Sequence, residues 1–147
     1  MISRLLKKTV FGLIIGFLLS FLFTIVYAGY SVGSTYNWSH GSTDFYNFST
    51  ILTDRNEIRA FGLIGSSITE PTGYLGTKNC IVNSSGVIAA SSSWRYSTGQ
   101  ASFFGTGFDR STLSNGNYYS QTETRYFRNG NFITQWTYGS SSQPFPD

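Results

Sequence analysis

The chain has 147 residues, of which 40% are hydrophobic, 18% aromatic and only 12% charged. Three of its ten Lys and Arg residues lie among the first eight residues, which leaves seven cations against seven carboxylates in the rest of the chain. A neutral domain argues against a nucleic-acid partner, which needs a basic surface. The only cysteine, Cys80, excludes an internal disulfide, and its apolar neighbours Ile81 and Val82 favour burial.

The first 28 residues have the three parts of a cleavable export signal. Cations come first, residues 10–26 are apolar and uncharged, and Val26-Tyr27-Ala28 supplies small residues where a signal peptidase cuts. We therefore expect a signal peptide with a signal helix at 1–28 and one extracellular, secreted domain at 29–147. The alternative is a retained anchor at residues 9–27, which would then be the chain's contact with the membrane.

The remainder has the composition of a β protein, rich in Ser, Thr, Gly, Asn and aromatic residues and poor in helix formers. We expect strands at 45–53 and 57–65, joined by the turn 54–56. A hairpin follows, with strands at 74–82 and 87–96, a turn at 83–86, and Cys80 opposite Ala89. A short strand at 101–104 then precedes a long loop between Gly105 and Gly116.

The last element is a hairpin over 118–127 and 132–138, because Asn129-Gly130 favours a two-residue turn in which both residues have positive φ. This turn sets the register of the paired strands. One face then carries Phe127–Phe132, Arg125–Thr134, Glu123–Trp136 and Gln121–Tyr138, and the other carries Tyr126–Ile133, Thr124–Gln135 and Thr122–Thr137. The fold class is therefore all-β, an antiparallel β-sandwich or small barrel of short strands with a C-terminal β-hairpin.

Four short segments with turn or strand signals follow one another along the chain. They are Gly73-Tyr74-Leu75-Gly76, Ser91-Ser92-Ser93-Trp94-Arg95-Tyr96, Gly116-Asn117-Tyr118-Tyr119-Ser120 and Asn129-Gly130. This order resembles small, secreted, β-rich proteins of Gram-positive bacteria whose function is uncharacterised, and the resemblance implies no activity. Near the start, Gly33-Ser34-Thr35-Tyr36 and Trp38-Ser39-His40-Gly41 show a fainter likeness to lactococcin-like bacteriocins.

Catalytic chemistry has few candidate residues. A thiolate at Cys80 would need a base, and His40 is the only histidine. Glu123 is a candidate acid for glycoside hydrolysis, but a polar pair with Arg125 or across the strands is the favoured interpretation. One Cys and one His do not make a zinc site. We predict no catalytic residue, no metal, no cofactor and no enzyme activity.

The aromatic residues are the main indication of function. Tyr and Trp beside amides and hydroxyls suit both sugar stacking and protein interfaces. We assign Phe127, Phe132 and Ile133 to the core, and predict a binding patch of Tyr118, Tyr119, Arg125 and Trp136. The favoured function is a secreted, non-enzymatic protein that binds a glycan or a protein at or outside the cell envelope. A bacteriocin-like antibacterial protein is the alternative, and a small extracellular hydrolase is less favoured.

Overall fold

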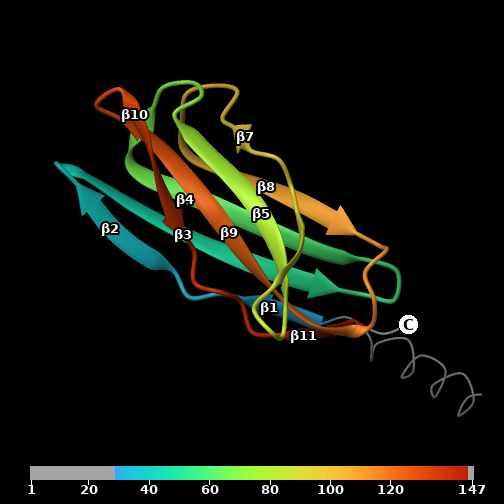
Figure 1. Ribbon diagram of the computed structural model, residues 1–147. Coiled ribbons are helices and arrows are strands. Elements are labelled where there is room, and N and C mark those ends of the chain that lie inside the picture. Colours follow the sequence, from blue (N-terminus) through green and yellow to red (C-terminus); the bar gives the residue numbers. More distant parts are fainter. Residues whose placement is uncertain (1–28, 146–147) are drawn as a thin grey trace, which may run out of the picture.

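The structure is a computed structural model that describes residues 29–145, so the predicted export signal, residues 1–28 with its signal helix, lies outside the described residues. Every regular element in the described part is a strand, which confirms the all-β class there. The strands form two antiparallel sheets that pack face to face, and neither sheet closes into a barrel. Figure 1 shows the two layers, with β10, β9 and β5 lying over β3, β4 and β8.

The first sheet has the order β1-β3-β4-β8, and β2 lies along the same edge of β3 as β1. Its strands are β1 (Gly29–Val32), β2 (Tyr36–His40), β3 (Thr43–Thr53), β4 (Ile58–Glu70) and β8 (Ala101–Arg110). The Asp54 carboxylate accepts hydrogen bonds from the backbone N–H groups of Asn56 at 2.7 Å and Glu57 at 2.9 Å, which closes the β3–β4 turn.

The second sheet has the order β10-β9-β5-β6, with β11 also paired to β9 and β7 also paired to β5. Its strands are β5 (Leu75–Asn83), β6 (Ile88–Ser91), β7 (Arg95–Tyr96), β9 (Gly116–Arg128), β10 (Asn131–Trp136) and β11 (Gln143–Phe145). The C-terminal hairpin is confirmed in its register, with Phe127 opposite Phe132 and Glu123 opposite Trp136. Asn129 and Gly130 have φ of 53° and 82°, as the turn requires.

The middle hairpin differs from the predicted register. Cys80 pairs with Ser91 rather than Ala89, and Val82 pairs with Ile88. The turn closes through a hydrogen bond from Asn83 N to Val87 O at 2.9 Å, with Gly86 at φ 79°. This turn is one residue shorter than expected, and an irregularity between Ile81 and Val82 shifts the register once more. The burial of Cys80 is confirmed, since its side chain is fully covered.

The predicted loop after Phe104 is wrong over its first half, because β8 continues to Arg110. Gly105 is not a turn residue there. A Cβ at this position would lie 2.6 Å from the Phe61 ring, so glycine lets that ring cover the strand. Strands β1, β2 and β11 were not predicted; they are short pieces along sheet edges.

Between the sheets, polar side chains separate two apolar clusters. The first cluster contains Ile51, Ile58, Ala60, Ile81, Tyr118 and Phe145, and the second contains Phe45, Ile64, Leu75 and Tyr126. Each of β3, β4, β5 and β9 contributes to both clusters, and the inward positions between them are Asn47 and Ser49 in β3, Gly62 in β4, Thr77 and Asn79 in β5, and Ser120, Thr122 and Thr124 in β9. The middle of the interior is therefore polar.

Hydrogen bonds join this polar layer within and across the sheets. Asn47 Nδ2 donates to Thr124 Oγ1 at 2.7 Å, and Thr122 Oγ1 donates to Asn79 Oδ1 at 2.9 Å. Asn79 Nδ2 also donates to the carbonyl of Thr106 at 2.6 Å. Because buried polar groups cost free energy unless they are paired, these bonds allow hydroxyls and amides to fill a core.

Burying Thr122 and Thr124 turns the opposite face of the last hairpin outward. The assignment of Phe127 and Phe132 to the core is therefore wrong, since Phe127 is half-buried and Phe132 is 43% exposed on the outer face. Ile133 is on the other face and packs against the second apolar cluster, as expected.

Candidate functional site

The outer face of the second sheet carries side chains in three rows across the strands. The first row contains Tyr74, Phe127 and Phe132, the second contains Tyr96, Gly76, Arg125 and Thr134, and the third contains Lys78, Glu123 and Trp136. We call the surface formed by Tyr74, Trp94, Tyr96, Arg125, Phe127, Phe132 and Trp136 the aromatic face. Successive rows are two residues apart along each strand, because side chains of a strand point to the same face at every second residue.

Arg125 is held in one orientation at the centre of the aromatic face. Its guanidinium carbon lies 3.8 Å from the centroid of the Trp94 ring. Nη1 donates to the Tyr96 hydroxyl at 3.2 Å, and Nε donates to Thr134 Oγ1 at 3.1 Å. No carboxylate pairs with Arg125 within the described chain, so its charge and remaining N–H donors are available to a ligand.

Gly76 makes the position of the Tyr96 ring possible. A Cβ on Gly76 would lie 2.7 Å from two carbons of that ring, which is closer than real Cβ contacts allow. Glycine therefore lets the ring lie directly over β5, beside Arg125. The same ring stacks near Trp94, with 6.1 Å between centroids, and lies 5.2 Å from the Phe132 ring.

The rings continue as a connected series toward the end of β9. Phe132 lies 5.1 Å from Phe127, and Phe127 lies 4.8 Å from Tyr74, with ring centroids as the reference points. Phe132 and Trp136 remain 43% and 42% exposed. Exposed rings of this kind, gathered on one face, are typical of interaction surfaces rather than of a solvated sheet.

Glu123 borders the aromatic face in a cross-strand ion pair. Lys78 Nζ lies 2.9 Å from Glu123 Oε1, and the hydrogen bond that Lys78 donates to this carboxylate raises the pKa of Lys78. This is the polar cross-strand pair that the sequence favours for Glu123.

The four residues of the predicted patch do not lie together. Arg125 and Trp136 are in adjacent rows of the aromatic face. Tyr119 lies four positions before Glu123 on β9, about 13 Å along the strand. Tyr118 is only 5% exposed, donates its hydroxyl to the carbonyl of Ser114 at 2.7 Å, and belongs to the first apolar cluster.

Sequence reasoning missed most of the aromatic face. The register expected for the last hairpin already puts Phe127 and Phe132 on the same face as Arg125 and Trp136, and this was the signal that could have found them. Trp94 and Tyr96 come from a segment beside β5 whose position relative to β9 depends on long-range pairing.

Cys80 and His40 lie in different parts of the fold. Cys80 pairs with Gln121 on β9, and burial raises the pKa of its thiol. His40 Nδ1 is hydrogen-bonded to the hydroxyl of Tyr126 at 3.1 Å, five positions further along β9, a distance of about 16 Å along the strand. The structure therefore does not bring these two residues together.

Among residues 29–145 no three His, Cys, Asp or Glu side chains gather as they would around a metal ion. The same residues include no helix with the length and apolar character to cross a membrane. No protein-family model, curated protein or solved structure matches the chain.

Proposed function

We propose that this chain is a secreted, non-enzymatic protein that binds a partner at or outside the cell envelope through its aromatic face. The observation that carries the proposal is the orientation of Arg125, stacked on Trp94 and flanked by exposed Phe132 and Trp136. Secretion rests on the export signal in residues 1–28.

A glycan is the favoured partner. Sugar rings have apolar faces that stack on flat aromatic side chains and hydroxyls that bond to charged and amide groups at the rim. Phe132 and Trp136 supply exposed rings on one strand, and Thr134 between them supplies a hydroxyl. Arg125, Lys78 and Glu123 lie beside these residues as hydrogen-bonding groups.

A protein partner is the second candidate, and the contact between Arg125 and Trp94 favours it. Arg, Trp and Tyr are the residues that most often dominate the binding energy of protein interfaces. A guanidinium already fixed by Tyr96 and Thr134 loses little side-chain entropy when a partner arrives.

A glycan array and a cell-wall pull-down test the proposal with purified protein. We expect retention on at least one glycan, and we expect Trp136→Ala and Arg125→Lys each to weaken it at least about tenfold, or about 1.4 kcal/mol. Matched controls lie away from the face: Tyr30→Ala removes a more exposed ring at 65%, and Arg110→Lys changes an arginine that lies over Phe108.

The outcomes separate the candidates. Absence of retention on any glycan or cell wall removes the glycan version. Binding to an envelope protein that Trp136→Ala abolishes then supports the protein version. Equal losses in the face variants and in the controls contradict the assignment of the aromatic face, because they would indicate a general effect on folding.

A further inference from the structure

Strand β4 contains a large bulge near its end. Gly65 pairs with Phe103 of β8, and Glu70 pairs with Ala101, so residues 66–69 stand opposite Ser102 alone. The pairing with β8 is interrupted here, although Ser66 still pairs with Phe45 of β3, and Ser67 to Thr69 are exposed. Bulges redirect side chains and occur often beside binding sites.

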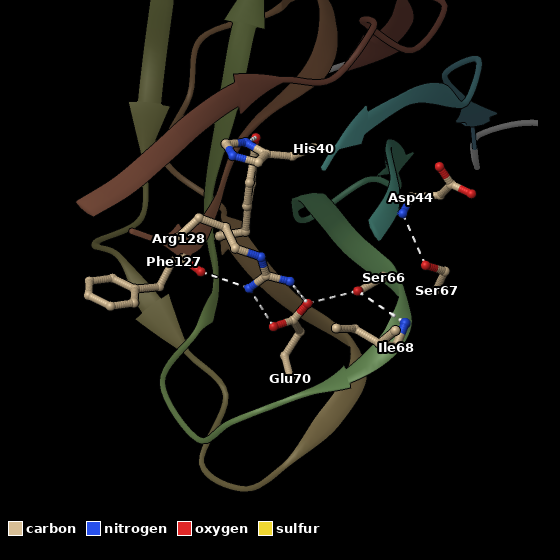
Figure 2. A network of polar contacts seen from close by, with 9 residues as sticks. His40, Asp44, Ser66, Ser67, Ile68, Glu70, Phe127 and Arg128 are labelled. Carbon is tan, nitrogen blue, oxygen red and sulfur yellow. Dashed lines mark hydrogen bonds and ion pairs between the residues drawn. The ribbon is translucent and has the colours of Figure 1, made fainter. Parts of the chain in front are cut away.

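Hydrogen bonds fix the shape of this bulge, as Figure 2 shows. Ser66 Oγ donates to Glu70 Oε1 at 2.8 Å and accepts from the backbone N–H of Ile68 at 3.3 Å. On the opposite side, the backbone N–H of Asp44 donates to Ser67 Oγ at 3.0 Å. The bulge is therefore tied to β3 and to its own strand.

An ion pair between buried Glu70 and half-buried Arg128 connects the bulge to the second sheet. Glu70 is 1% exposed and accepts from Arg128 Nη1 at 2.7 Å and from Arg128 Nη2 through its other oxygen. Arg128 Nη1 also donates to the carbonyl of Phe127 at 2.8 Å (Figure 2). Buried ion pairs seldom stabilise more than apolar residues of the same size, and their best-attested use is to fix one geometry.

Beside the fixed bulge lies a hollow of about 450 Å³, which we call the β4 hollow. Its walls come from the β2–β3 hairpin and from the bulge, and they include Asn37, Trp38, Ser39, Asp44, Tyr46 and Ser67. This volume falls within the range of small-molecule sites. The walls combine hydroxyl, amide and aromatic groups with one carboxylate and no cation, which disfavours anionic ligands.

Two of the wall residues have binding groups in place. The Tyr46 ring lies on the backbone of Gly65, where a Cβ would be 2.1 Å from the ring, so its orientation is fixed. Asp44 Oδ1 accepts from Ser39 Oγ at 2.6 Å, and no cation pairs with this carboxylate in the described chain. The Trp38 ring packs on Phe45 and Tyr126 in the second apolar cluster, so it supports the hollow from the interior side.

We propose that the β4 hollow is a second ligand site, which binds one neutral sugar residue. Tyr46 stacks on the apolar side of the sugar ring. The Asp44 carboxylate and the Asn37 amide hydrogen-bond adjacent hydroxyls, as a carboxylate with an unused oxygen and an amide can do. The Glu70–Arg128 pair positions the bulge and touches no ligand. The site is independent of the aromatic face, because it is built on the first sheet.

Nuclear magnetic resonance titration of the ¹⁵N-labelled protein tests this site, with glucose, galactose and N-acetylglucosamine as separate probes. We expect at least one sugar to shift the signals of Asn37, Ser39, Asp44 and Tyr46, with a dissociation constant on the order of 1 mM, as ligands of this size allow. Repeating the titration with the methyl glycoside and the corresponding disaccharide distinguishes a free sugar from the end unit of a glycan.

Two variants and one control complete the test. Asp44→Asn and Tyr46→Ala should each weaken binding at least about tenfold, whereas Tyr30→Ala, an exposed ring elsewhere on the first sheet, should not. The inference is overturned if none of the three sugars gives saturable shifts at the hollow, or if both variants bind as the parent does. Shifts confined to Arg125 and Trp136 would also overturn it while supporting the aromatic face.

Discussion

Gly62 is the position where the polar interior leaves least room for a larger residue. A Cβ there would lie 2.1 Å from Thr122 Oγ1, 2.3 Å from Thr122 Cγ2 and 2.6 Å from Asn79 Oδ1. Carbon atoms normally approach to about 3.5 Å, so Gly62→Ala must push the sheets apart or displace the Thr122 side chain by about 1 Å or more. Displacing Thr122 weakens its hydrogen bond to Asn79, and separating the sheets weakens the bonds that cross between them, such as the one from Asn47 to Thr124.

The expected cost has two parts. Overpacking of a core costs about 1–3 kcal/mol. Leaving the buried side-chain oxygen Oδ1 of Asn79 without its donor, the Thr122 hydroxyl, costs about 1–3 kcal/mol more. We therefore expect Gly62→Ala to lower the free energy of unfolding by about 4 kcal/mol, and the melting temperature by about 15 °C for a domain of this size.

Urea unfolding followed by tryptophan fluorescence measures this change. Gly107→Ala is the matched control, because it changes a strand glycine whose Cβ would meet nothing within 4 Å, and we expect it to stay within about 0.5 kcal/mol of the parent. In a Thr122→Ala background the Gly62→Ala cost should fall by at least about 1 kcal/mol. A Gly62→Ala cost equal to that of the control would refute the close packing of the polar layer.

Three further results are expected. Because burial raises the pKa of the Cys80 thiol, Ellman's reagent should react with it in urea but not in the native protein, and full native reaction would contradict its burial. Burial raises the pKa of Glu70, but hydrogen bonds from Arg128 and Ser66 outweigh it, and the net pKa is lowered. This pair therefore stabilises the fold above about pH 4.3, and its contribution is lost as the pH falls through the folded-state pKa of Glu70. The Glu70→Gln variant lacks this titrating group. Between about pH 7 and about pH 3, its urea midpoint should therefore change less than that of the parent. Finally, Gly130→Ala should cost about 1–2 kcal/mol at φ 82°, unlike Gly99→Ala, which meets nothing within 4 Å.

Local turn chemistry was the part of the fold that the sequence predicted best. Asn129-Gly130 predicted the register of the last hairpin correctly from Phe127–Phe132 to Glu123–Trp136, since a two-residue turn with positive φ allows only one register. The middle hairpin has a longer turn, in which Gly86 marks the bend but not the number of residues in the loop. Its register was therefore predicted wrongly around Cys80.

The alternation of residue types along the last hairpin did not predict which of its two faces is buried. A strand with aromatic and hydroxyl residues on opposite sides normally buries the aromatic side. Here Thr122 and Thr124 point inward because Asn79 and Asn47 meet them there, from positions 43 and 77 residues away in the chain. Such partners are known only once the sheets are paired and packed.

The last hairpin exposes its aromatic side, and the energetic cost of this arrangement bears on function. Burying a large apolar side chain normally contributes about 1.5–3 kcal/mol, and Phe132 and Trp136 forgo much of this by remaining exposed. Polar side chains fill the interior instead, through bonds that contribute less than apolar packing per residue. Departures from the usual pattern of burial are expected at surfaces that bind a partner or a ligand. Because the exposed rings gather around a fixed Arg125 rather than scatter, this departure supports binding at the aromatic face over a general tolerance of exposed aromatics.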